Sequence, residues 1–175
     1  DNDADALTFD GGLDTTGVSG TVTLHGLLDS SDDAMVFGAV TLGGNTGIDT
    51  DATTTAGDIT LGAVTGAGFS LSLSTGDNIG AADITGTTVT NVGTLALTDV
   101  GGTAGFTGAV TTTSLTADNT VANVSLTGGG TAITNAVALT NDGTLVLGDN
   151  NADALTFDGG LDTTGVSGTV TLHGL

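Results

Sequence analysis

Residues 149–175 read DNNADALTFDGGLDTTGVSGTVTLHGL, and residues 1–27 read DNDADALTFDGGLDTTGVSGTVTLHGL. The two stretches differ at one position, where Asn151 stands in place of Asp3, and they lie 148 residues apart (Leu155 against Leu7). Near-identity over this length indicates duplication, and a long internal repeat is the sequence signature of arrays and solenoids. We therefore divide the chain into one unit, residues 1–148, and the start of the next, residues 149–175. We expect both to be part of a tandem array in a longer protein.

The composition restricts the partners that the protein can have. The chain contains no Lys or Arg, its 20 acidic residues are all Asp, and its formal charge is −20. Binding to nucleic acid or to an anionic membrane surface depends on Lys and Arg, so both are excluded as electrostatic partners. We expect divalent cations to be the natural partners. The hydrophobic fraction of 38% allows a core, so the charge does not imply disorder.

The pattern of apolar residues predicts short β-strands throughout. Residues 69–74 read FSLSLS, in which apolar and polar side chains alternate with the period of a strand. Similar pairs of apolar residues two apart recur along the chain, separated by turn-forming stretches such as DGGLDTTG, STGDNIG and LTGGG. Thr and Val are abundant and Gly occurs 31 times, which disfavours helix. The fold class is therefore all-β.

Among all-β architectures, the sequence favours a β-solenoid (parallel β-helix) over a sandwich or barrel. Outward positions carry Thr and Ser, inward positions carry small or aliphatic residues, and a solenoid can be extended by repetition. Leu24, Leu42 and Leu61 are 18 and 19 residues apart. We expect a coil of about 18–19 residues, hence about eight coils in residues 1–148. At about 4.8 Å per coil, one unit would advance about 38 Å.

Several strand phrases carry a resemblance to a known group of proteins. They are GTVTLHG (20–26), GDITLGAVTG (57–66), NVSLTGGG (123–130) and GTLVLGDN (143–150). They resemble the repeats of filamentous-haemagglutinin-type adhesins and autotransporter passenger domains in composition and rhythm. The resemblance implies a right-handed parallel β-helix, exported to the surface of a bacterial or archaeal cell, with roles in adhesion, biofilm formation and surface scaffolding.

Clusters of Asp are the candidate metal ligands. Ca²⁺ takes six to eight oxygen ligands, which closely spaced carboxylates can supply. The alternative is that these residues are solvated turn residues that keep the surface soluble and block edge pairing. No cofactor is required by this interpretation, and Ca²⁺ is the candidate ligand. The candidate ligands are Asp1, Asp3, Asp5, Asp29, Asp32, Asp33, Asp49 and Asp51.

The function expected from these features is structural. A solenoid polysaccharide lyase needs a basic residue, and a sugar-stacking platform needs Trp or Tyr; the sequence has none of these, so we expect no enzyme. We expect an extracellular or cell-surface filament or stalk, with an acidic surface that associates with cations and with itself as partner through end-to-end continuation or polymerisation. The alternative is a surface adhesin or another binding module, with a ligand-binding or ice-binding face formed by rows of Thr.

Overall fold

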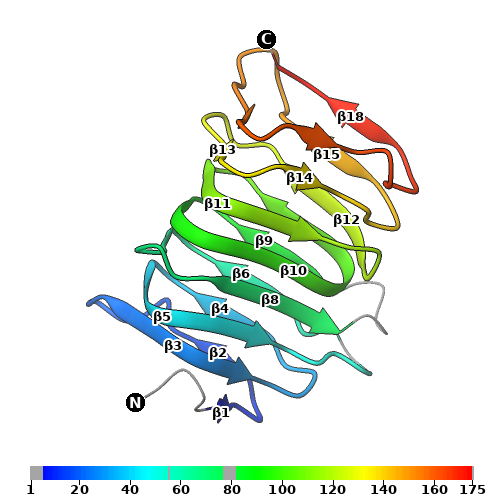
Figure 1. The fold of residues 1–175 in the computed structure, drawn as a ribbon. Helices are drawn as coiled ribbons and strands as arrows, with labels where there is room; N and C mark the ends of the chain where they lie inside the picture. Colours follow the sequence, from blue (N-terminus) through cyan, green and yellow to red (C-terminus); the bar gives the residue numbers. More distant parts are fainter. Residues whose placement is uncertain (1–5, 55, 77–81, 175) are drawn as a thin grey trace.

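The computed structural model describes residues 6–54, 56–76 and 82–174, which form a single parallel β-solenoid of about eight turns. Figure 1 shows the coils stacked from β1 at one end to β18 at the other, with the two termini at opposite ends. All strand pairs found in the described residues are parallel, and each joins a strand to the coil before or after it. The all-β solenoid predicted from the sequence is confirmed.

Each coil has three strand positions, which we call face A, face B and face C in chain order. Face A contains β1 (Ala6–Thr8), β8 (Leu71–Gly76), β14 (Val137–Ala138) and β17 (Leu161–Asp162). Face B contains β2 (Leu13–Asp14), β4 (Met35–Phe37), β6 (Ile59–Leu61), β9 (Ile84–Gly86), β12 (Val121–Leu126), β15 (Leu145–Leu147) and β18 (Val170–Leu172). Face C contains β7 (Val64–Thr65), β13 (Ala132–Ile133) and β16 (Thr156–Phe157).

Four longer strands bend around a corner and belong to more than one face. Three of them, β3 (Val22–Asp29), β5 (Val40–Asp49) and β11 (Val110–Ala117), begin on face C and end on face A. The fourth, β10 (Val89–Phe106), covers faces C, A and B in turn. The register shifts where these strands turn, for example between Leu24 and Gly26, which lets the chain change direction without losing its neighbours.

The core is built from vertical files of like residues. On face C, five valines stack in register, and on face B an aliphatic file extends from Leu13 through all eight layers. Branched aliphatic side chains suit a strand that packs the same group above and below it. The valine file consists of Val22, Val40, Val64, Val89 and Val110.

The coil length differs from the expected 18–19 residues. A spacing of 18 holds between Val22–Leu24 and Val40–Leu42, whereas other neighbouring coils are 20 to 25 residues apart, as in Ala104↔Val124 and Ile59↔Ile84. Leu42 and Leu61, which suggested the period, lie on different faces. The error arose because corners absorb variable numbers of residues, so the leucine spacing does not report the stacking register. The eight layers therefore extend over residues 13–172 of face B.

A second file on face B shows how closely the coils fit. Phe106 is fully buried and stacks on Gly86, where a Cβ would lie 2.5 Å from the Phe106 ring. Gly86 in turn lies between Leu61 and Phe106 in the register of the ladder. The absence of a side chain at Gly86 thus makes room for the largest residue of the next coil. No helix in the described residues is long and apolar enough to cross a membrane.

This fit gives the first prediction. We expect Gly86→Ala to lower the free energy of unfolding by about 1–3 kcal/mol, because overpacking forces the Phe106 ring to move. Gly11→Ala is the matched control, since nothing lies within 4 Å of a Cβ there, and it should change stability by less than about 0.5 kcal/mol. Urea unfolding measures both. The double variant Gly86→Ala/Phe106→Leu should recover part of the loss, and equal effects of the two single variants would contradict the packing.

Candidate cation-binding edge

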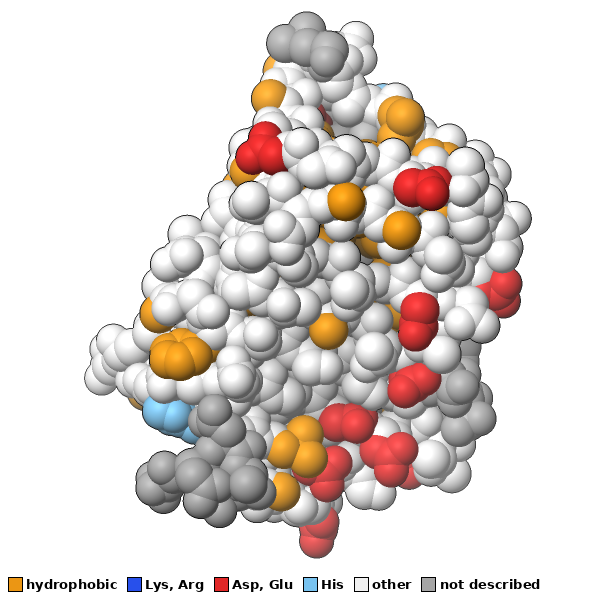
Figure 2. Space-filling view, viewed as in Figure 1, with side chains coloured by type: hydrophobic (Ala, Val, Ile, Leu, Met, Phe, Trp, Pro, Cys, Tyr) orange, Lys and Arg blue, Asp and Glu red, His pale blue; other side chains and the backbone are white. Residues whose placement is uncertain are grey.

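Most of the carboxylates gather on one corner of the solenoid, the corner that leads from face A to face B. We call this corner the acidic edge, and Figure 2 shows its carboxylates along one side of the rod. Its members belong to seven successive coils, so they lie above one another although they are far apart in sequence. The acidic edge consists of Asp10, Asp29, Asp32, Asp33, Asp49, Asp51, Asp58, Asp83, Asp99, Asp118 and Asp142.

The local backbone of this corner favours Asp. Asp32, Asp51 and Asp99 adopt positive φ angles of 65°, 40° and 50°. Asp and Asn tolerate this left-handed conformation better than other residues with side chains, because their short polar side chains bond the nearby backbone. The acidic edge thus exists partly because the turn conformation requires residues of this kind.

Beneath the acidic edge, buried hydroxyl groups tie the corner loops to the core. Ser30 donates a hydrogen bond to the carbonyl oxygen of Asp33 at 2.6 Å, and Thr50 donates one to the carbonyl oxygen of Gly57. Thr75 repeats the arrangement in the next coil with the carbonyl oxygen of Ala82 at 3.4 Å. All three residues are buried. The sequence analysis missed them, because polar residues at inward positions of a corner have no periodic signal.

Several carboxylates of the edge hold neighbouring coils together. The backbone N–H of Asp83 donates to Oδ1 of Asp58 at 2.8 Å, and the N–H of Thr103 donates to Oδ1 of Asp83 at 2.7 Å. Asn123 continues this column by accepting from the N–H of Thr144 at 2.9 Å. Each side-chain oxygen therefore satisfies a backbone donor in the following coil, which is a structural role for the charge.

Asp32 is the most strongly bonded of these residues. Its Oδ1 accepts hydrogen bonds from the backbone N–H groups of Thr53 and Thr54, and the Thr54 hydroxyl donates to Oδ2 at 3.0 Å. The backbone donors of Thr54 and Thr53 hold the pKa of Asp32 well below its ordinary value of 3.8. Since the chain has no Lys or Arg, this stabilisation of a carboxylate comes from hydrogen-bond donors rather than from an ion pair.

The same physical cause acts at shorter range in Asp-x-Thr turns. The hydroxyl and then the backbone N–H of the Thr two residues later lower the pKa of Asp14, Asp118 and Asp162. In the first of these turns Thr16 Oγ1 donates to Asp14 Oδ1 at 2.6 Å. The backbone N–H groups of Asp149 and Asn150 lower the pKa of Asp153 in the same way.

The predicted Ca²⁺ ligands are distributed unevenly over this structure. Asp29 and Asp49 stack in register as neighbours on face A, and Asp49 also accepts the backbone N–H of Asp51 at 3.0 Å. Asp32 is engaged by the next coil, and the carbonyl of Asp33 is bonded by Ser30. The remaining candidates, Asp1, Asp3 and Asp5, lie outside the described residues. Among the described residues, no three Asp or His side chains form a group that could hold a metal ion.

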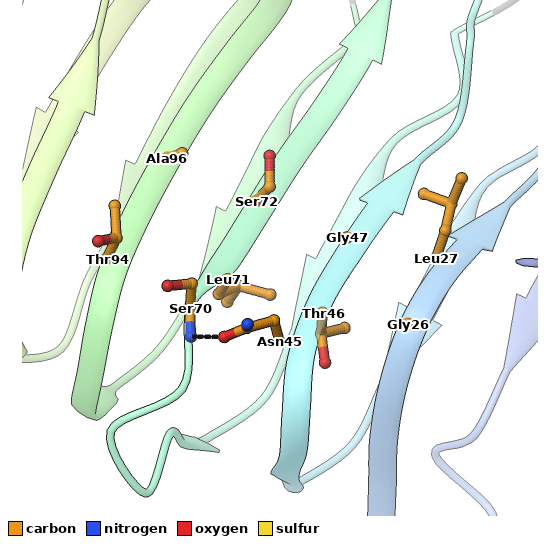
Figure 3. Close-up of a pocket in the computed structure, with 10 residues that line it drawn as sticks. All are labelled: Gly26, Leu27, Asn45, Thr46, Gly47, Ser70, Leu71, Ser72, Thr94 and Ala96. Atoms are coloured by element: carbon orange, nitrogen blue, oxygen red, sulfur yellow. Dashed lines mark hydrogen bonds between the residues drawn. The ribbon is translucent and has the colours of Figure 1, made fainter. Parts of the chain in front are cut away.

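A shallow hollow on face A is the largest depression that we find beside the edge, with a volume of about 420 Å³. Figure 3 shows that its floor consists of small residues, including Gly26, Gly47 and Ala96, between Leu27 on one side and Thr94 on the other. The N–H of Ser70 donates to Oδ1 of Asn45 at its margin, at 3.0 Å. The hollow carries no charged side chain and offers hydroxyl and backbone groups only.

The class of protein that the fold defines is a parallel β-solenoid with one acidic edge. Comparisons of the chain with protein-family models, with curated proteins and with solved structures found no match.

The hydrogen bonds of Asp32 give a prediction with a defined pH dependence. A carboxylate whose pKa is lowered by folding stabilises the fold above its unfolded pKa, and this contribution is lost as the pH falls toward the folded value. Asp32→Ala should therefore lower the melting temperature at pH 7 and pH 5, and its difference from the natural chain should shrink below about pH 3.8. Thermal unfolding followed by circular dichroism measures this.

Asp142→Ala is the matched control. Asp142 lies on the same edge, and its carboxylate accepts no hydrogen bond from the described residues. Its removal should leave the melting temperature unchanged or raise it slightly, because it relieves repulsion among like charges. Equal losses in the two variants, or a loss at Asp32 that persists at low pH, would contradict the proposed role of the hydrogen bonds.

Proposed function

We propose that the protein is a structural rod, a segment of an extracellular filament or surface stalk built from tandem solenoid units, without a catalytic role. The observation that carries the proposal is that the repeated sequence forms a solenoid coil at both ends of the described chain, in residues 6–27 and again in residues 154–174. A coil that can be both first and last in a stack is the element that an extendable rod needs. Solenoid repeats contact only their neighbours, so length can be added without a new fold.

The proposed location rests on the resemblance stated above. Filamentous-haemagglutinin-type adhesins and autotransporter passengers, which the strand phrases resemble, are surface-exported β-helices. A bacterial or archaeal cell surface, with a part in adhesion or biofilm formation, is the corresponding proposal for this chain. The solenoid fold supports it at the level of architecture.

We infer in addition that the acidic edge associates with divalent cations. The stacked carboxylates of Asp29 and Asp49 are the best candidates for direct Ca²⁺ ligands, because they are neighbours in the ladder and no Lys or Arg neutralises them. Backbone carbonyls and water would have to complete the coordination. Other carboxylates of the edge would attract cations more diffusely.

Ca²⁺ addition tests this inference. A ligand that binds the folded state raises the melting temperature, so millimolar Ca²⁺ should stabilise the protein more than Mg²⁺, and more than NaCl of the same ionic strength. Asp29→Asn/Asp49→Asn should remove the excess effect of Ca²⁺, whereas Asp158→Asn, which is off the acidic edge, should retain it. Equal stabilisation by all three salts would reduce the interaction to charge screening and overturn direct ligation.

Electron microscopy of the native material tests the structural role. We expect long fibres with an axial spacing near the distance between stacked strands, about 4.8 Å. Globular particles would overturn the proposal. Discrete short rods would favour the second candidate function, a binding module carried on a solenoid.

One observation favours that second candidate. On face C, four outward threonines stack in successive coils, and three of them are fully exposed to solvent by class. A regular row of hydroxyl and methyl groups on a flat face is suited to ordering water or to adhesion. The row consists of Thr23, Thr41, Thr65 and Thr90.

A further inference from the structure

The two copies of the repeated sequence fold in the same way. In the first copy the N–H of Thr16 donates to Asp14 Oδ1 at 2.8 Å, and in the second the N–H of Thr164 donates to Asp162 Oδ1 at 2.9 Å. The turn before it is also shared: the N–H of Gly12 donates to the carbonyl of Phe9 at 3.1 Å, and its counterpart bond in the second copy measures 2.9 Å. The repeated sequence thus determines a local structure that does not depend on its position in the rod.

The two copies nevertheless occupy different faces. Leu13 lies on face B, where it pairs with Met35, whereas its counterpart Leu161 lies on face A, where it pairs with Val137. Val22 lies on face C, and its counterpart Val170 lies on face B. The second copy is therefore displaced by one face relative to the first.

This displacement fixes how far one unit advances. The first copy begins on face A of the first coil, and the second begins on face C of the seventh coil. The chain passes twenty strand positions between them, three per turn, so 148 residues complete six and two-thirds turns. At about 4.8 Å per turn this is an advance of about 32 Å, less than the 38 Å expected from shorter coils.

The open edges of the two copies are complementary. In the first copy, the described strands β1 and β2 are covered on the side of the following coil, by β3 and β4. In the second copy, β16, β17 and β18 are covered on the side of the preceding coil, by β13, β14 and β15. Each strand of the repeated sequence is thus seen paired on one side in one copy and on the opposite side in the other.

The exposed apolar residues follow the same rule. Leu172 is 65% exposed, whereas its counterpart Leu24 is 6% exposed, because Leu42 of the next coil covers it. At the other end Leu7 is 56% exposed, and its counterpart Leu155 packs against the core. Two of the five large apolar side chains exposed in the described residues are therefore positions that a neighbouring coil covers in the other copy.

We propose that the open edge of β16–β18 is the seat of a following unit, whose residues corresponding to 28–49 pair with it as residues 28–49 pair with the first copy, and that each unit is thereby turned by one face relative to the unit before it. This inference rests on the proposed function, because it assumes that units follow one another in one chain. The occupant is specified by sequence: the segment that covers residues 6–27 here is the segment that covers their near-identical copy.

The shift by one face is testable in the 175-residue chain. Ala138 and Asp162 are outward neighbours on face A, at the stacking distance that a disulfide can bridge. Ala138→Cys/Asp162→Cys should form an intramolecular disulfide upon mild oxidation. Asp14→Cys/Val36→Cys, an outward pair in the first copy, is the positive control. Val146→Cys/Asp162→Cys would be the close pair if the second copy kept face B, and a disulfide there in place of the first would overturn the shift.

The covering unit is testable by extending the chain at its carboxyl end with a second copy of residues 28–148. Leu24→Asp should lower the melting temperature in the 175-residue chain, whereas Leu172→Asp should leave it nearly unchanged, because Leu172 is exposed. In the extended chain Leu172→Asp should become as damaging as Leu24→Asp. An unchanged tolerance of Leu172→Asp in the extended chain would overturn the proposed seat.

The two failures can be distinguished. If the extended chain forms a rod twice as long in electron micrographs but Leu172→Asp remains tolerated, the units are joined in another register and only this inference fails. If the extended chain shows two separate short rods, the continuous filament of the proposed function fails as well. The disulfide result in the 175-residue chain is independent of both.

Discussion

The parallel hydrogen bonding between successive coils is the interaction on which the rest of the structure depends. A coil of this solenoid has no core of its own: its inward side chains are buried only by the coils above and below, in files such as the valines of face C. Corners can therefore vary in length, as the spacings of 18 to 25 residues show, provided that the strands return to register. The fold tolerates irregular loops because the stacking of its faces is regular.

The second constraint is charge without counter-charge. A chain with 20 Asp and no Lys or Arg cannot form the usual ion pairs, so its carboxylates are stabilised by backbone N–H groups and hydroxyls. At Asp58 and Asp83 the donor belongs to the next coil, so the same bond that stabilises the charge also joins two layers. Charge and cohesion are therefore linked at the acidic edge.

The sequence was sufficient to predict the all-β solenoid, because the alternation of apolar and polar residues and the repeat both reflect local and translational regularity. It was insufficient for the coil length, since Leu42 and Leu61 have similar surroundings but lie on different faces. It also could not show that Asp29 and Asp49 are neighbours while Asp32 is engaged by Thr53 and Thr54, because these relations depend on register across about 20 residues. The inward hydroxyl of Thr50 is likewise visible only once the corner is folded.

The rotation of units by one face has a consequence for the shape of a long rod. Repulsion among like charges along a single edge would lengthen that edge and bend the rod away from it. Asp10 lies on the corner between faces A and B, whereas its counterpart Asp158 lies on the corner between faces C and A. In a rod of such units the bending direction turns by a third of a circle from one unit to the next, so the curvature cancels over every three units and the rod runs straight.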